Sequence, residues 1–323
     1  MINTSNCTHL AIRNAAKSLI AGNLVAFPTE TVYGLGADAT NQEAIARLYK
    51  VKGRPTDHPI IVHISSIRNL RKWAREIPVY AMNLAKIFWP GPMTLILPKT
   101  ELAKDFITGY QDTVGIRVPS NPIALSLLSE FETRGGLGVA APSANKFGKV
   151  SPTTASDVVL DLGGLLASED QILNGGDCLI GVESTIIDCT RNEPIILRPG
   201  AVTKEQLQNF LKFNKSVNVN LNSQVKYSGS LDSHYSPVAK VFLTGTPNIG
   251  DGFIAYSHIK TPKGAIRLAS PKNNEEYAHL LYKSFRYADF EGISKIYVIP
   301  PNNYGVGAAI CDRLIKSSYK NLT

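Results

Sequence analysis

Short apolar runs typical of buried strands are interleaved with capped, amphipathic helix patterns through the first two thirds of the chain. The strand candidates are LVAF, IIVHI, TLILP, LGVAA, STIIDC and PIILR. Helix starts are expected at Thr8, at Thr40 with Glu43, at Asn121 with Pro122, at Thr154 with Asp157, and at Thr203 with Gln206. Because strands and helices mix without strict alternation, the pattern predicts an α/β fold with α+β character, built on a twisted mixed sheet.

The composition changes after Phe213, where Asn, Ser and Gly become frequent and large apolar residues become rare. Such a segment is typical of a linker. From Ala239 the strand and helix patterns resume, and they end in a strand, a glycine-containing loop and a helix. We therefore predict a first domain over residues 1–212, a linker over 213–238, and a smaller Rossmann-like α/β domain over 239–323.

Composition excludes several classes of protein. With 323 residues, 44% of them hydrophobic and 19% charged, the chain is typical of a globular protein and not of a disordered one. The four cysteines form no CxxC or CxxH pair, so neither a disulfide framework nor a zinc site is predicted. The N-terminus lacks the apolar core of a signal peptide, and no run reaches about 18 apolar residues. We expect a soluble cytoplasmic protein without membrane contact, whose net charge of +8 favours phosphorylated small molecules or nucleic acid as partners.

The stretch FPTETVYGLGADAT, residues 27–40, contains a glycine pattern that resembles a dinucleotide fingerprint. That fingerprint requires a strand that leads directly into the glycines and a helix that begins there. Here PTETVY separates the strand from Gly34 and Gly36, so a dinucleotide site is disfavoured and a packed turn is the alternative. The short polar groups Thr29, Glu30 and Thr31 beside a core strand must still find hydrogen-bond partners.

Two cations, Lys52 and Arg54, stand immediately before Pro55. A residue before proline is kept out of the helical region, and in an extended segment positions i and i+2 point to the same side. Both cations are therefore predicted to face one place, where a phosphate chain would suit them. A solvated basic loop is the alternative. His63 lies within an apolar strand, where a core histidine is the alternative to a ligand-binding one.

Further polar residues occur in segments that are otherwise apolar or glycine-rich. Short donors and acceptors in APSANKFGKVSPTTA suit ribose or phosphate oxygens, although ordinary Asx and Ser turns explain them equally well. Arginines inside apolar strands need partners, and several together indicate a buried anion site. The residues concerned are Ser143, Asn145, Ser151, Arg117, Glu183, Ser184 and Arg198. No hydrolase elbow, HExxH or Walker A pattern is present, so the polar set is predicted to position charged reactants.

Taken in order, seven segments resemble the YrdC family of threonylcarbamoyl-AMP synthases. They are FPTETVYGLGADA, KGRPTDHPIIVHI, WPGPMTLIL, VGIRVPSNPIA, APSANKFGKVSPTTASDV, GVESTIID and ILRPGAVT, and they span roughly residues 10–205. The tail, from SGSLDSHYSP onward, resembles the longer two-domain form of that family. The resemblance covers nearly the whole chain and implies a mixed sheet of the YrdC type.

The resemblance implies a nucleotidyltransferase that converts L-threonine, bicarbonate or CO2, and ATP into L-threonylcarbamoyladenylate and pyrophosphate. This is the first step towards threonylcarbamoyl-adenosine in tRNA, so a tRNA threonylcarbamoyl transferase machinery is expected downstream, together with weak RNA binding. Mg2+ is expected to arrive on the ATP phosphates, so no metal ligands from the protein are expected.

The family's site residues carry over by position. Lys52 and Arg54 are expected to be catalytic, by neutralising the triphosphate and the leaving group. The expected ATP contacts are Lys52, Arg54, His58, Thr113, Ser143, Asn145, Ser151, Arg198 and Tyr235. The expected threonine contacts are Thr31, His63, Arg117, Ala141 and Ser184. His58 stands where the family often has Asn, and Ala141 where a hydroxyl or small residue is common.

The predicted linker carries the motif HYSP, and Tyr235 within it is expected to reach over the nucleotide as part of a lid that excludes water. A passive linker is the alternative. For the whole chain, the main alternative function is a tRNA- or double-stranded-RNA-binding module without catalysis, since a basic face can bind phosphates without turnover. A dehydrogenase built on the Gly-Leu-Gly turn is a weaker third hypothesis.

Overall fold

The computed structural model describes residues 3–6, 8–211, 218–219, 225–229 and 234–318. The first domain is built on a mixed sheet in the order β1-β8-β2-β3-β7-β4-β6-β5-β9-β10-β11. Its strands are β1 (Asn3–Asn6), β2 (Val25–Phe27), β3 (Gly34–Asp38), β4 (Val62–His63), β5 (Met93–Pro98), β6 (Thr113–Arg117), β7 (Val139–Ala140), β8 (Gln171–Asn174), β9 (Thr185–Asp188), β10 (Ile195–Arg198) and β11 (Asn218–Val219). Strand β5 pairs antiparallel with β6 and parallel with β9, so the predicted mixed sheet is confirmed.

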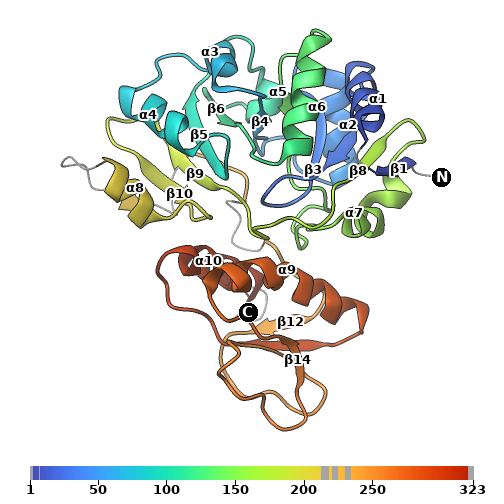
Figure 1. Ribbon diagram of the computed structural model, residues 1–323, viewed down its shortest axis with the longest axis vertical. Coiled ribbons are helices and arrows are strands. Elements are labelled where there is room, and N and C mark those ends of the chain that lie inside the picture. The colour runs from blue at the N-terminus through green and yellow to red at the C-terminus, as the bar shows by residue number, and fades with distance from the viewer. Residues whose placement is uncertain (1–2, 7, 212–217, 220–224, 230–233, 319–323) are drawn as a thin grey trace.

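The helices of the first domain cover this sheet (Figure 1). They are α1 (His9–Ile20), α2 (Gln42–Lys52), α3 (Leu70–Trp73), α4 (Val79–Phe88), α5 (Asp105–Thr108), α6 (Pro122–Thr133), α7 (Ala155–Leu162) and α8 (Lys204–Leu211), with 3-10 turns at Ile67–Asn69 and Gly163–Leu165. Buried apolar side chains such as Leu35, Leu48 and Trp73 form the main core between helices and sheet. In the part of the chain that is described, no helix has both the length and the apolar character needed to cross a membrane.

Most of the predicted helix starts agree with the structure, and one is wrong. The side chains of Thr8 and Asn121 cap α1 and α6, and Thr154 with Asp157 forms the capping box of α7. Thr203 and Gln206 make the expected reciprocal hydrogen bonds before α8, at 2.9 and 3.2 Å.

The cap of α2 is Asn41 and not Thr40. The Asn41 Oδ1 accepts from the backbone N–H of Ala44 at 3.0 Å. Thr40 is unavailable because its hydroxyl donates to Asp38 at 2.7 Å in the preceding turn.

The second domain has its own sheet, in the order β12-β15-β13-β14, with every pair parallel. Its elements are β12 (Lys240–Phe242), β13 (Gly252–Ile254), β14 (Ile266–Ala269), α9 (Asn274–Phe290), β15 (Lys295–Val298) and α10 (Val306–Ser318). This small parallel α/β unit is the one that the sequence predicts. Figure 1 shows α9 and α10 lying between the small sheet and the first domain.

The two domains share a hydrophobic cluster. Val32, Val150 and Val182 of the first domain pack with buried residues of the second, including Tyr282 and Leu314. Much of the predicted linker 213–238 lies outside the described residues. Of its described parts, β11 pairs with β10 and Lys226 forms an ion pair with Asp57 at 2.7 Å, both in the first domain, whereas Tyr235 packs in the cluster that the two domains share.

The two glycines of the opening stretch lie inside strand β3 and not in a phosphate-binding turn. A Cβ on Gly36 would lie 2.7 Å from Val139 Cγ1 and 2.8 Å from the Phe27 ring. Only glycine lets the neighbouring strand and side chain approach this closely. The dinucleotide fingerprint is therefore coincidental, and Gly36 is a packing residue.

Candidate active site

One cavity of about 50 Å³ collects most of the residues that the sequence singles out. Eleven of the fourteen predicted site residues line it: Thr31, Lys52, Arg54, His63, Arg117, Ala141, Ser143, Asn145, Ser184, Arg198 and Tyr235. They come from the loop after β2, the end of α2, strands β4, β6 and β10, the loops after β7 and before β9, and the linker. A larger hollow of about 520 Å³ beside α8 and α10 contains none of them. Concentration of charge, and not size, marks the candidate site.

Lys52 and Arg54 both face this cavity, but the extended segment predicted for them is wrong. Lys52 is the last residue of α2, and Gly53 ends the helix in the left-handed conformation with φ of 61°. The turn made by glycine, and not strand alternation, brings Arg54 to the same side. The Lys52 ammonium donates to the backbone oxygens of Ser143, at 2.5 Å, and Asn145. The segment that contains Lys52 and Arg54 is thereby bonded to the loop that contains Ser143 and Asn145.

Burial shapes the charge of this pair. Arg54 Nη2 donates to the Pro59 carbonyl at 2.8 Å, and its guanidinium lies over the Phe147 ring, 5.3 Å from the centroid. Burial lowers the pKa of Lys52 well below its ordinary value, and the charge of Arg54 lowers it further. Burial likewise lowers the pKa of Arg54 to about 10. A bound anion would counter both effects, so the pair is suited to a phosphate group.

The loop that contains Ser143 and Asn145 forms the opposite wall. Ser143 bridges to Gly34 of β3, which places the loop beside the glycine strand. The Asn145 Nδ2 donates to the backbone oxygens of Lys146 and Lys149, at 2.8 and 2.9 Å. Its Oδ1 is buried and has no partner among the described residues. A buried acceptor of this kind is expected to find its partner in a ligand.

The polar groups Thr29, Glu30 and Thr31 have the partners that their burial requires. Arg117 Nη2 donates to Glu30 Oε1 at 2.6 Å and to Thr31 Oγ1 at 3.0 Å. Thr29 Oγ1 lies 2.8 Å from Thr31 Oγ1. His63 is the direct neighbour of Arg117 across strands β4 and β6. Burial, aided by the charge of Arg117, lowers the pKa of His63 to about 3, so its imidazole is neutral at pH 7.

Arg198 and Ser184 form a third group at the cavity. Arg198 Nη2 donates to Ser184 Oγ at 3.1 Å, and Nη1 donates to the Ser228 carbonyl at 2.7 Å. The Ser184 hydroxyl also lies 2.8 Å from Thr94 Oγ1. Arg198 therefore joins the loop before β9, through Ser184, to the part of the linker that contains Ser228.

Three predicted residues lie outside the cavity. Ser151 is fully buried, and its hydroxyl donates to Glu183 of the cavity wall at 2.5 Å. His58 packs against the Phe147 ring with centroids 5.4 Å apart. Thr113 lines a separate hollow of about 20 Å³. The structure thus does not bring the side chains of His58, Thr113 and Ser151 into the cavity that holds the other eleven residues.

Tyr235 closes one side of the cavity. It is buried and adopts a positive φ of 61°, which is uncommon for a residue with a side chain. Its hydroxyl has no partner within the described ranges. A Cβ on Gly229 would come within 2.3 Å of that hydroxyl, so glycine is required where the linker passes Tyr235.

Two residues that contact the cavity wall were not predicted from the sequence, because they lie in the second domain and belong to none of the motifs. Tyr282 and Arg313 come from the second domain and reach Glu183, a residue of the cavity wall. A sequence signal for Arg313 exists, because it follows Ile310 by three positions and so lies on the apolar face of its helix. Within the described part of the chain, no group of three or more His, Cys, Asp or Glu side chains could hold a metal ion.

Comparisons with known proteins agree with this geometry. Residues 17–200 match the Sua5/YciO/YrdC family model, described as Telomere recombination, and residues 202–318 match the model described as Threonylcarbamoyl-AMP synthase, C-terminal domain. The threonylcarbamoyl-AMP synthase of Pyrococcus abyssi is 39% identical, over 95% of this chain and 94% of its own. That of Bacillus subtilis is 38% identical, over 95% of this chain and 92% of its own.

Solved structures lead to the same result. The crystal structure of P. abyssi Sua5 complexed with L-threonine has a TM-score of 0.87 and 37% identity, and covers 99% of this chain and 98% of that one. The fold of E. coli YciO is similar over 61% of this chain, with a TM-score of 0.52. The chain therefore belongs to the Sua5/YciO/YrdC family, as an enzyme of the two-domain threonylcarbamoyl-AMP synthase type.

Proposed function

We propose that the enzyme converts L-threonine, bicarbonate or CO2, and ATP into L-threonylcarbamoyladenylate and pyrophosphate. The observation that carries this proposal is that a phosphate-type wall, with Lys52 and Arg54, and an amino-acid-type wall, with Thr31 and Arg117, line one cavity. The reaction joins two charged reactants, and proximity of this kind supplies much of the rate of such a step.

The nucleotide is assigned to the end of the cavity that contains Lys52, Arg54, Arg198 and Asn145. Guanidinium groups can clamp phosphate oxygens in pairs, and the lysine adds a point charge. Pyrophosphate leaves with more negative charge than it carried within ATP, and the two buried cations stabilise that charge. Mg2+ is proposed to enter as part of the ATP substrate.

L-Threonine is assigned to the end near Thr31, His63, Arg117 and Ser184. Its carboxylate suits the Arg117 guanidinium, and its hydroxyl suits the short polar groups beside it. The neutral imidazole of His63 adds no charge that would repel the substrate's ammonium group. The L-threonine complex of the P. abyssi relative supports an amino-acid subsite in this fold.

The proposed chemistry has two steps. The unprotonated threonine amine adds to CO2, forms a carbon–nitrogen bond and loses a proton, which gives a carbamate. A carbamate oxygen then attacks the α-phosphorus, and the bond to the β-phosphate oxygen breaks to release pyrophosphate. Both the carbamate and the product hydrolyse in water, so the site must be closed during turnover.

The small cavity supports a lid. Ligand pockets span roughly 300–1,000 Å³, whereas this cavity has about 50 Å³. The walls must therefore separate before ATP can enter. Tyr235 and Gly229, which cover the cavity from the linker, are the segment proposed to move.

Exchange of labelled pyrophosphate into ATP tests the reaction. We expect exchange that requires both L-threonine and bicarbonate, and that is lost when L-alanine replaces L-threonine. Absence of exchange, combined with tight binding of tRNA, would instead favour the RNA-binding module. Transfer of the adenylate to a tRNA threonylcarbamoyl transferase machinery, weak RNA binding and a cytoplasmic location stay predictions.

A further inference from the structure

A carboxylate stands in the wall of a cavity that is proposed to bind phosphates. Glu183 lines the cavity and is 6% exposed. An unpaired negative charge at this position would repel a nucleotide. Its partners therefore decide whether the cavity can accept ATP, and two of them belong to the second domain.

Three donors hold Glu183. The Ser151 hydroxyl donates from the first domain at 2.5 Å. From the second domain, Tyr282 of α9 donates at 3.0 Å and Arg313 Nε of α10 donates at 2.8 Å. Burial alone would raise the pKa of Glu183, but the charges of Arg313 and Arg198 overcome that effect and lower it to about 2.

Arg313 also contacts the proposed lid. Its guanidinium lies 5.0 Å from the centroid of the Tyr235 ring, a cation–π distance. The side chain is fully buried, and Asp312 accepts a hydrogen bond from its Nη1 at 2.5 Å. One guanidinium thus touches both a carboxylate of the cavity wall and the aromatic ring that covers the cavity.

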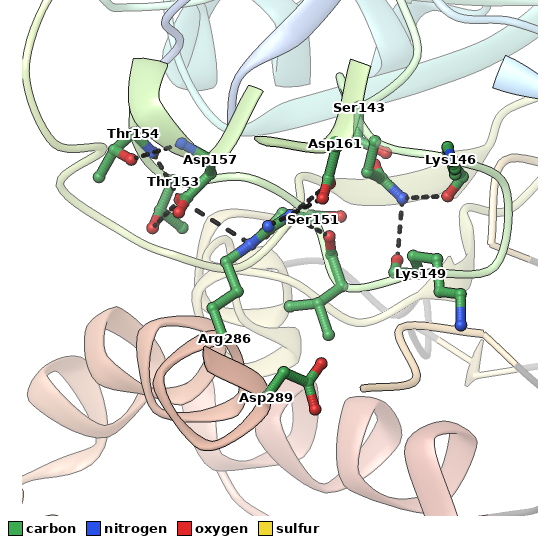
Figure 2. Close-up of polar contacts among 12 residues, drawn as sticks. Ser143, Lys146, Lys149, Ser151, Thr153, Thr154, Asp157, Asp161, Arg286 and Asp289 are labelled. Carbon is green, nitrogen blue, oxygen red and sulfur yellow. Dashed lines mark hydrogen bonds and ion pairs between the residues drawn. The ribbon is translucent and has the colours of Figure 1, made fainter. Parts of the chain in front are cut away.

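A second arginine fixes the two domains in this arrangement. Figure 2 shows Arg286 of α9 reaching towards Asp157 and Asp161 of the first domain. Its Nη2 donates to Asp161 at 2.7 Å and to the Val150 carbonyl at 2.6 Å. Val150 directly precedes Ser151, which donates to Glu183. The second domain therefore holds the Glu183 carboxylate directly, through Arg313 and Tyr282, and also holds the segment that carries Ser151, through Arg286.

We propose that Arg313 and Tyr282 are positioning residues of the nucleotide site: they hold the Glu183 carboxylate away from the phosphates, and through it and Tyr235 they complete the cavity wall. This inference rests on the proposed function, because it assigns that wall to ATP. The second domain is then a part of the active site and not an independent appendage.

Steady-state kinetics of full-length variants, with ATP and L-threonine varied separately, test this inference. Tyr282→Phe removes one hydrogen bond to Glu183 and keeps the ring. We expect the KM for ATP to rise about tenfold, the cost of a lost bond to a charged group, while the KM for L-threonine changes less than twofold. The matched control is Lys283→Gln, which removes an exposed ion pair to Asp177 that also crosses the domains. It should leave both KM values unchanged.

A double-mutant cycle separates positioning from general packing. Arg313→Met keeps most of the side-chain volume and should lower kcat/KM for ATP about a hundredfold, because Glu183 is then buried without its main counter-charge. In a Glu183→Gln background the same change should cost less than about threefold. Equal losses in both backgrounds, or parallel rises in the two KM values, would overturn the inference. So would identical behaviour of Tyr282→Phe and Lys283→Gln.

These measurements distinguish failure of the proposed reaction from failure of the positioning role. Circular dichroism and thermal unfolding show whether Arg313→Met folds, and Tyr282→Phe provides the test if it does not. Calorimetric Kd values for a non-hydrolysable ATP analogue are measured in parallel. Absence of turnover in the unmodified enzyme would contradict the proposed function, whereas an unchanged Kd in Tyr282→Phe would contradict the positioning role.

Discussion

The Lys52 ammonium donates a hydrogen bond to the backbone oxygen of Ser143 at 2.5 Å, across 91 positions of sequence. This contact joins the end of α2 to the loop after β7 and fixes the two walls of the proposed nucleotide site relative to each other. Because Lys52 is buried, its charge needs these carbonyls as partners whether or not a phosphate is present.

If Lys52 acts on the triphosphate as proposed, Lys52→Met should slow the reaction and leave threonine binding in place. We expect kcat/KM for ATP to fall about 10²- to 10³-fold, as for loss of one group that stabilises developing charge. Pyrophosphate exchange measures the rate, and calorimetry measures threonine affinity, which should change less than twofold. Lys50→Met, an exposed lysine of the same helix, is the control. Equal losses in the two variants would contradict the assignment.

Local chemistry explains why much of the fold could be predicted from sequence. Capping residues such as Thr154 act within one turn of their own helix, and short apolar runs identify strands without reference to the rest of the chain. The predicted cap at Thr40 is wrong, and the cause is also local. Two neighbouring residues compete to cap α2, and the hydroxyl of Thr40 is already bonded to Asp38.

The site was less predictable where it depends on long-range contacts. Lys52 and Arg54 share a cavity as expected, but through the left-handed Gly53 and not through an extended segment. The bond between Glu183 and Arg313 spans 130 positions and exists only because the two domains dock. No local pattern in either segment specifies that pairing.

The Arg117–Glu30 pair predicts separable effects on stability and binding. Both side chains are about 95% buried, so Arg117→Met leaves an uncompensated carboxylate. The free energy of unfolding should fall by about 3 kcal/mol, as measured by urea denaturation. Adding Glu30→Gln removes that charge and should recover most of the stability. Threonine affinity should stay lost in both variants, since neither has the guanidinium. Recovery of binding in the double variant would show that Arg117 is structural only.

The neutral state of His63 predicts a pH dependence of stability. Its pKa is about 3 in the fold, against an ordinary value of 6.5, because burial and Arg117 disfavour the charged ring. Below pH 6.5 the unfolded chain takes up a proton that the folded chain does not. The free energy of unfolding should therefore fall as the pH falls from about 6.5 towards 3, by up to about 1.4 kcal/mol per pH unit from this group.

Urea denaturation at pH 7, 6 and 5 checks this sign. His63→Gln should reduce the slope in that range without abolishing it, because burial also lowers the pKa of His234 to about 3 and this second ring contributes with the same sign. Replacement of the exposed His258 by Gln should leave the slope unchanged. The range from pH 7 to 5 lies above the pH values at which protonation of Glu183 affects stability. The lowered pKa of Glu183, about 2, removes stability only as the pH falls below about 4.5. An unaltered slope in His63→Gln would show that this ring is not the group responsible.

The Tyr235 hydroxyl predicts opposite effects on stability and on nucleotide affinity. It is buried without a partner among the described residues, so Tyr235→Phe removes a polar group that the fold does not use. The free energy of unfolding should stay the same or rise by up to about 1 kcal/mol. If the hydroxyl meets the nucleotide when the lid closes, affinity for an ATP analogue should fall about tenfold. Thermal unfolding and calorimetry measure the two quantities, with the exposed Tyr304→Phe as the control. A fall of more than about 1 kcal/mol in the free energy of unfolding, with unchanged affinity for the ATP analogue, would show that Tyr235 has a structural role and would contradict its proposed role in a lid.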